Sequence, residues 1–421
     1  MALITNVERQ RGGVDFILHR AAELYPTRTA VIDNLNQVTL DYAGLRSRSV
    51  RLAHALHTSG VSAGEPVAYV FFNEATALEI VFACALLGAV AMPINNRLAP
   101  PEARDYLRRQ HVKTLIVREE FIPFAEHTEI DRLIVRGPHV PAHALCYAGL
   151  VENASETLFP PRASWEEPYM VVMTGGTTGG SKAATVTHGG ALFDMLSIIN
   201  HWSIDPGCQS LVYAPMFHAA GLGWAAMPVL WQAGTLLLPP TTSFEPDYFL
   251  QTVINHPVDA TFLVPAMVDP IYQAWDGKPI TSLRSLSLAS AAVPEPLRRK
   301  LAEMFPATDS LVCYGMTETY SITMQDPSEF TAYPASSGHA ALAARVRVVD
   351  DQGFEVPRGT VGQVVTRSFG QSLYYANDPD NTAATFKKLP DDPQGLEWTH
   401  TGDVGFMDEE GRITLVDRAK D

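Results

Sequence analysis

Short apolar runs rich in β-branched residues alternate with longer helical stretches through most of this 421-residue chain. Residues 67–71 and 114–117 are predicted as strands, and residues 75–87 and 101–109 as helices. Neighbouring parallel strands need a long connection, usually a helix, so this alternation predicts parallel sheets covered by helices. The chain is therefore predicted to have an α/β fold.

The alternation is interrupted once and then changes character. Residues 138–167 are rich in Pro, Ala and Glu and are predicted as a linker. After about residue 338, β-rich runs are joined by turns that contain Asp, Glu and Gly. We therefore expect two stacked α/β subdomains with flanking helices, 1–165 and 166–335, and a small antiparallel, barrel-like β subdomain, 336–421.

Composition excludes some classes of function. The formal net charge is −15, whereas a nucleic-acid partner normally needs a basic face. Four cysteines lie far apart without CxxC pairing, which is typical of reduced cysteines in a cytoplasmic protein. The longest apolar stretch, 80–92, is too short to span a bilayer. We expect a cytoplasmic protein without a membrane span, and the sequence leaves its oligomeric state open.

A loop of glycines and hydroxyl residues, 173–182, follows the apolar run 169–173. Successive N–H groups in such a loop form a nest for anions, and Lys182 adds a positive charge. A Walker A loop ends in Gly-Lys-Ser/Thr, whereas Lys182 here lies between Ser181 and Ala183. The composition predicts a phosphate-binding loop of another kind, with a flexible surface turn as the alternative.

This loop resembles the phosphate loop of the AMP-forming acyl-adenylating enzymes, which include acyl- and aryl-CoA ligases, luciferases and peptide-synthetase adenylation domains. The chain departs from that pattern at Gly175, Ser181 and Ala183. The resemblance implies a catalytic role for Lys182 and a set of residues that bind the phosphates of ATP: Thr174, Gly175, Gly176, Thr177, Thr178 and Lys182.

The segment Tyr314-Gly315-Met316-Thr317-Glu318 follows a short apolar run and is very similar to a second motif of that family. The resemblance implies that Tyr314 stacks on adenine and that Thr317 binds the α-phosphate. It also implies that Glu318 holds Mg²⁺, which prefers carboxylate and phosphate oxygens. The alternative is a strand followed by an N-capped helix.

Further motifs of the family appear in the expected order. Asp403, in Thr-Gly-Asp, is implied to accept hydrogen bonds from the ribose, and Arg418 to bind it as well. The small residues Ser290, Ala291 and Ala292 are implied to back the adenine, although Ser290 and Ala292 depart from the usual pattern.

The segment 214–221 resembles the place where acyl- and aryl-CoA ligases put an aromatic or His gate beside the acid. His218 is the matching residue, with a satisfied core histidine as the alternative. Relatives that activate amino acids usually have Asp here, and this chain has none. We expect an alkyl or aryl acid, with a substrate pocket formed by His218, Ala289, Gly315 and Met316.

The last residues, 417–421, resemble the family's hinge, with Lys420 as the pivot. In the family a mobile C-terminal lid of about 100 residues follows and carries a further lysine. Because that lid is absent from this sequence, we expect weak activity from these residues alone.

The resemblance therefore implies an acid–thiol ligase that uses ATP, Mg²⁺ and CoA. It converts a carboxylic acid other than an amino acid to an acyl-adenylate, releases pyrophosphate, and forms a thioester with CoA. Two alternatives stay open: a ligase that loads an acyl carrier protein, and a lidless nucleotide-binding module without turnover.

Overall fold

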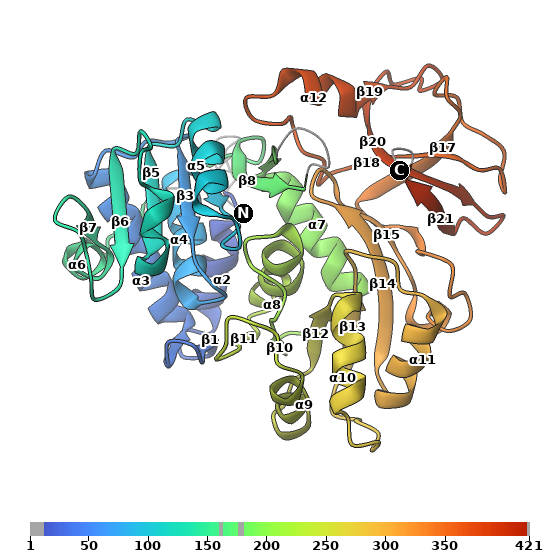
Figure 1. Cartoon of the computed structure of the whole chain (residues 1–421), viewed down its shortest axis with the longest axis horizontal. Coiled ribbons are helices and arrows are strands. Elements are labelled where there is room, and N and C mark those ends of the chain that lie inside the picture. The colour runs from blue at the N-terminus through green and yellow to red at the C-terminus, as the bar shows by residue number, and fades with distance from the viewer. Residues whose placement is uncertain (1–11, 160–162, 176–180, 419–421) are drawn as a thin grey trace, which may run out of the picture.

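The computed structural model describes residues 12–159, 163–175 and 181–418. Its strands form three sheets, and helices cover the two larger ones (Figure 1). In these ranges no helix is both long enough and apolar enough to cross a membrane.

The first sheet has seven strands in the order β7-β6-β5-β3-β4-β8-β9. All its pairs are parallel except β8–β9. Its strands are β3 (Pro66–Val70), β4 (Val90–Pro93), β5 (Thr114–Arg118), β6 (Arg132–Arg136), β7 (Leu145–Cys146), β8 (Pro168–Thr174) and β9 (Lys182–Thr187). Its associated helices are α4 (Ala75–Leu87), α5 (Pro100–Arg109), the 3₁₀ helix η1 (Glu119–Phe124) and α6 (Tyr147–Asn153).

The second sheet has nine strands in the order β16-β15-β14-β13-β12-β10-β11-β1-β2, parallel from β14 to β1. Its strands are β1 (Thr29–Asp33), β2 (Val38–Asp41), β10 (Gln209–Leu211), β11 (Thr235–Leu238), β12 (Ala260–Leu263), β13 (Ser285–Leu288), β14 (Asp309–Met316), β15 (Tyr320–Met324) and β16 (His339–Ala340). The remaining helices of this part are α2 (Asp15–Leu24), α3 (Tyr42–Thr58), α7 (His188–His201), the π-helix η2 (Ala220–Ala226), α8 (Met227–Trp231), α9 (Pro246–Asn255), η3 (Pro265–Met267), α10 (Val268–Ala274), α11 (Glu295–Met304) and η4 (Pro327–Glu329).

The third sheet is antiparallel and has five strands. They are β17 (Ala344–Val349), β18 (Gly362–Ser368), β19 (Phe386–Lys388), β20 (Glu397–Met407) and β21 (Ile413–Arg418), with helix α12 (Pro379–Thr385) before β19. The α/β class and the antiparallel C-terminal sheet expected from the sequence are thus confirmed.

The strands are shared between the sheets differently from the predicted ranges 1–165 and 166–335. The hairpin β1–β2 joins the nine-stranded sheet by parallel pairing with β11, whereas β8 and β9 extend the seven-stranded sheet. The sheet that a strand joins depends on which sheet edge lies next to it in space. The position of the strand along the chain does not reveal that edge. The stretch 138–167, expected as a linker, contains β7 and α6. That the three predicted ranges fold as independent units stays a prediction.

The largest hydrophobic core joins the two α/β sheets into one body. It contains residues of α4 and β8 from the first sheet and of α7, β11 and β12 from the second part. Helix α4 is buried along its whole length and ends at Gly88, whose φ of 77° lies in the left-handed region that favours glycine. This shared core fixes the two sheets relative to each other, and the site lies where their strands end.

Candidate functional site

Two cavities meet at the carboxyl ends of β13 and β14, where ligand sites of parallel α/β sheets usually lie. One has a volume of about 440 Å³ and is called the apolar cavity below. The other has a volume of about 640 Å³ and is called the polar groove. They share a wall formed by Ser290, Cys313, Gly315 and Met316.

The apolar cavity is lined mainly by alanines and large apolar side chains. The predicted pocket residues His218, Ala289, Gly315 and Met316 all line it, as do Thr317 and Gly175. Sequence reasoning missed further lining residues: Arg97, Trp224, Phe262, Met267 and Tyr320. No carboxylate is among the described lining residues, so the cavity favours a neutral or anionic guest over an ammonium group.

His218 projects into the apolar cavity with its ring against Phe217, at 4.5 Å between ring centroids. The surrounding protein, and to a lesser degree the Arg97 guanidinium, lower the pKa of His218. The imidazole is therefore neutral near pH 7, which suits a gate beside an apolar group.

Asn73 holds the loop that carries His218. Its Nδ2 donates to the carbonyls of Val212 and Ala214, at 3.1 and 2.8 Å, and its Oδ1 accepts from Met216 N at 2.8 Å. Asn73 comes from the first sheet, just beyond β3, and thus ties the two sheets together at the cavity. Its place after a strand of a parallel sheet was the available signal, and sequence reasoning missed it.

Ser290 and Tyr320, both in the cavity walls, have φ values of 75° and 57°. Such left-handed values are uncommon for residues with a side chain, and strain of this kind gathers at functional sites. Ser290, which departs from the family pattern, thus holds a backbone conformation that glycine would adopt without strain.

The polar groove brings together the predicted adenine and ribose residues Ser290, Ala291, Ala292, Tyr314 and Asp403. The Tyr314 hydroxyl donates to Asp403 Oδ2 at 2.6 Å. Asp403 N donates to Thr401 Oγ1 at 3.0 Å, which fixes this part of β20. Because Asp403 lies on β20 and Tyr314 on β14, the groove is completed only when the third sheet packs on the second.

Arg298 is a buried groove residue that the sequence did not single out. Its guanidinium donates to the carbonyls of Val293, Phe330 and Ser336 and to Gln325 Oε1. Burial lowers the pKa of Arg298 to about 10, so it stays a cation at neutral pH. It joins α11 to the loop after β15 and so stabilises one side of the groove.

Glu318 lies in the turn between β14 and β15 and is 6% exposed. Its Oε1 accepts a 2.5 Å hydrogen bond from the Tyr375 hydroxyl, and its backbone carbonyl accepts from Ser372 N at 2.7 Å. Among the described residues no cluster of three His, Cys, Asp or Glu side chains forms a protein-only metal site. One carboxylate fits Mg²⁺ held mainly by substrate phosphates, which is the usual way proteins bind this ion.

The predicted phosphate loop connects two antiparallel strands, with Thr174 opposite Lys182 in the register of β8 and β9. A Walker A loop instead leads into a helix. Lys182 Nζ lies 4.9 Å from the centroid of the Tyr375 ring. Gly176, Thr177, Thr178 and the hinge residue Lys420 lie outside the described residues. Arg418 ends β21, opposite Asp403 in the strand register.

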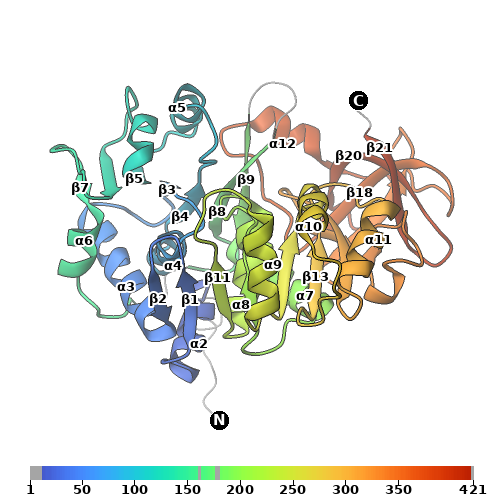
Figure 2. The ribbon, with the colours of Figure 1, turned by 60° about the horizontal axis from the view of Figure 1, so that its bottom comes forward.

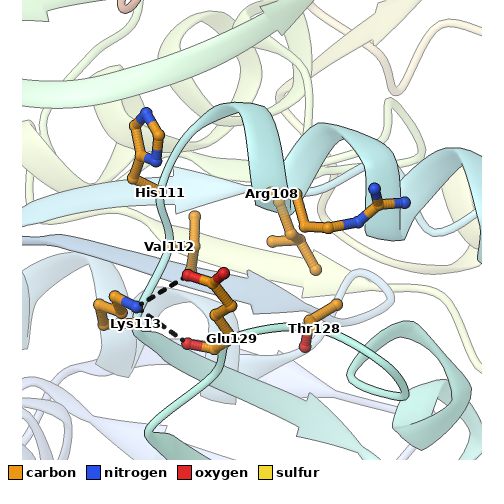
Figure 3. A pocket seen from close by; sticks show the side chains of 7 residues that line it. Arg108, His111, Val112, Lys113, Thr128 and Glu129 are labelled. Carbon is orange, nitrogen blue, oxygen red and sulfur yellow. Dashed lines mark hydrogen bonds and ion pairs between the residues drawn. The ribbon is translucent and has the colours of Figure 1, made fainter.

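A further pocket, of about 240 Å³, lies at the end of α5 (Figure 3). Its lining includes Arg108, His111 and Thr128. Lys113 Nζ donates to the Glu129 carboxylate and carbonyl, at 3.3 and 3.4 Å, so this ammonium is already partnered. None of the described motif residues lines this pocket, and the site is therefore assigned to the two cavities that share a wall.

Comparison with known proteins agrees with this arrangement. The profile of a family described as AMP-binding enzyme matches residues 18–376. The indoleacetate–CoA ligase of Aromatoleum aromaticum is 30% identical over 411 residues, covering 96% of this chain and 78% of that protein. A feruloyl-CoA synthase of an Amycolatopsis species is 30% identical over 405 residues, with the same two coverages. The crystal structure of the anthranilate CoA ligase AuaEII with anthranoyl-AMP superposes with a TM-score of 0.89 at 24% identity, covering 98% of this chain and 79% of that one, a likeness of fold.

Proposed function

This chain belongs to the AMP-binding enzyme family, and on that premise we propose that it activates a carboxylic acid with ATP for transfer to CoA. The acid is an alkyl or aryl acid without an amino group. The reaction gives an acyl-adenylate and pyrophosphate and then an acyl-CoA thioester. The observation that carries the proposal is the wall that the two cavities share. On one side lies an apolar cavity whose described lining has no carboxylate, and on the other lies a groove lined by residues predicted to bind adenine and ribose.

The apolar cavity supports the choice of acid. Its described lining has no Asp or Glu to pair with a substrate ammonium. Because His218 is neutral, Arg97 is the charged side chain of this described lining. Apolar walls with a few polar groups are typical of small-molecule sites, and about 440 Å³ lies within their usual range. The relatives named above act on indoleacetate and ferulate, which favours an aryl acid.

In the proposed first step, the reacting groups are the carboxylate of the acid and the α-phosphate of ATP. A carboxylate oxygen of the acid attacks the α-phosphorus of ATP and forms a new P–O bond. The bond from the α-phosphorus to pyrophosphate breaks, and pyrophosphate leaves with the electron pair. No general base is needed, because the acid is already ionised at neutral pH. Thr317 in the cavity wall and Lys182 at the end of the phosphate loop stabilise the phosphate charge. Glu318 would hold Mg²⁺, which would supply positive charge to neutralise the leaving pyrophosphate.

The test of this proposal measures ligand binding first and enzymatic turnover second. Non-hydrolysable acyl- and aryl-adenylate mimics are screened by thermal unfolding, because a ligand at a hundred times its Kd adds about 2.7 kcal/mol. The acid that matches the best mimic is then assayed for ATP–pyrophosphate exchange and for thioester formation with CoA. No stabilisation by any mimic, nor by ATP with Mg²⁺, would contradict the proposal.

Two other results separate the alternatives. Exchange without a CoA thioester, rescued by a carrier protein, indicates a carrier-loading ligase. Binding without exchange indicates a nucleotide-binding module. We also propose that residues 1–421 alone turn over slowly, because the family resemblance implies a C-terminal lid that carries a further lysine. Appending such a lid should raise the exchange rate, and an unchanged rate would contradict this point.

A further inference from the structure

Tyr375 lies between the two charged residues that the proposed reaction needs. It is 3% exposed and comes from the connection between β18 and α12. On one side its hydroxyl reaches Glu318, and on the other Lys182 lies over the face of its ring. None of the motifs found in the sequence contains this residue.

The chain around Tyr375 extends the first sheet beyond β9. Leu373 N donates to the carbonyl of Thr185 at 2.9 Å, and Ala376 N donates to that of Ala183 at 2.8 Å. Figure 2 shows α12, the next element of this connection, close to β9. Because neighbouring side chains of an extended segment point in opposite directions, Tyr374 is 41% exposed while Tyr375 faces inward.

Tyr375 is also fixed from behind. Its backbone N–H donates to Thr382 Oγ1 at 3.0 Å, and its ring packs against Phe386 at 5.9 Å between centroids. The backbone pairing with β9 and this packing leave the ring little freedom. A residue held this firmly can impose an orientation on its neighbours.

The two contacts of Tyr375 have opposite charge preferences. The hydroxyl donates to the Glu318 carboxylate, and the electron-rich face of the ring attracts the Lys182 ammonium. A tyrosine hydroxyl ordinarily ionises only near about pH 10, so at physiological pH it donates this hydrogen bond to the Glu318 carboxylate.

We propose that Tyr375 is a positioning residue that presents Glu318 to Mg²⁺ and Lys182 to phosphate while keeping the two from pairing with each other. This inference rests on the proposed function. A direct Lys182–Glu318 ion pair would use up both charges, and ATP with its metal would have to break it. The ring gives the ammonium a weaker partner that phosphate displaces, and the hydroxyl fixes one carboxylate oxygen.

The test separates the hydroxyl from the ring. Tyr375→Phe keeps the ring and loses the hydrogen bond to Glu318, whereas Tyr375→Leu loses both contacts. The exposed neighbour supplies a matched control, Tyr374→Phe. Binding of a non-hydrolysable ATP analogue is measured by calorimetry over a Mg²⁺ titration, and melting without ligand checks that each variant is folded.

We expect Tyr375→Phe to raise the Mg²⁺ concentration for half-maximal binding by about tenfold, the loss typical of one hydrogen bond to a charged group. Metal-free binding of the analogue should stay unchanged in this variant. Tyr375→Leu should weaken metal-free binding as well, because Lys182 is then free to pair with Glu318. Tyr374→Phe should match the unaltered protein.

A Glu318→Gln background distinguishes positioning from general damage. In that background Tyr375→Phe should no longer change the Mg²⁺ dependence, because the carboxylate it orients is gone. If Tyr375→Phe shows the normal Mg²⁺ dependence, or the same shift with and without Glu318, the inference is wrong while the proposed function stands. If the unaltered chain does not bind the analogue at all, both fail.

Discussion

The apolar cavity takes its walls from the two α/β sheets, which share one large core, whereas the polar groove also needs the antiparallel third sheet. The cavity is thus fixed by the packing that holds the molecule together. The groove depends on a contact between subdomains, made at Tyr314 and Asp403. This difference implies that acid binding and nucleotide binding respond separately to substitution, and the following variants test that separation.

The largest effect is expected on the nucleotide side. Glu318→Gln removes the negative charge proposed to hold Mg²⁺, but keeps an oxygen that accepts the hydrogen bond from the Tyr375 hydroxyl. ATP–pyrophosphate exchange should fall by about 10²–10³-fold, the usual cost of losing a preorganised electrostatic group. Binding of the acid alone, followed by calorimetry, should be unchanged. Equal losses in both measurements would show that the two sites are not separate.

Asp403→Asn tests the contact between sheets. The amide oxygen still accepts from Tyr314, but the charge that receives the ribose hydroxyls is lost. Hydrogen bonds to charged groups contribute about 1.5–3 kcal/mol, so the Kd for ATP should rise about tenfold to a hundredfold. Asp351→Asn, on an exposed turn, is the control. An unchanged Kd for ATP would remove Asp403 from the site.

Asn73→Ala should act on the cavity alone. It removes the three hydrogen bonds that hold the loop before His218. Each hydrogen bond contributes about 0.5–1.5 kcal/mol net, and only part of this loss weakens binding of the acid. The KM for the acid should therefore rise about tenfold. Asn96→Ala, which loses a contact to the Phe71 carbonyl, is the matched control. A rise in the KM for ATP instead would argue against separate sites.

The smallest effect on catalysis is expected from Asp194, a buried carboxyl on α7 that accepts from Ser321 N at 3.1 Å. Burial raises the pKa of Asp194 from 3.8 to about 7. Folding therefore favours its protonated form, and the stability that this form contributes is complete below pH 3.8 and lost as the pH rises through 7. Between pH 5 and 8 this amounts to about 2–3 kcal/mol of unfolding free energy.

Denaturant unfolding of Asp194→Asn and the unaltered protein at both pH values measures this loss. The variant should lack that part of the pH dependence. His188 does not interfere, although burial lowers its pKa to about 4 and its contribution is lost as the pH falls from 6.5, because both proteins share it. Parallel pH profiles for the two proteins would contradict the assignment.

The sequence predicted the α/β class and part of the lining of the two cavities, because the motifs lie where strands end. It did not predict Asn73 or Tyr375. Each acts through partners more than 50 positions away, and neither belongs to a short pattern. Strand β9 was missed as well. Its residues Ala183 and Ala184 are small, and pairing with the edge of the sheet decides its conformation. The roles of Gly176, Thr177, Thr178 and Lys420 stay predictions, since these residues lie outside the described ranges.

The shared wall has a consequence for how such an enzyme acquires new substrates. Ser290, Gly315 and Met316 line both the apolar cavity and the polar groove. Trp224 on η2 and Phe262 on β12 line the apolar cavity and not the groove. Substitutions at these far residues change the room for the acid and leave the ATP side of the wall as it is. Selection, or a designer, can therefore retune the choice of acid in small steps while the chemistry of activation is inherited intact.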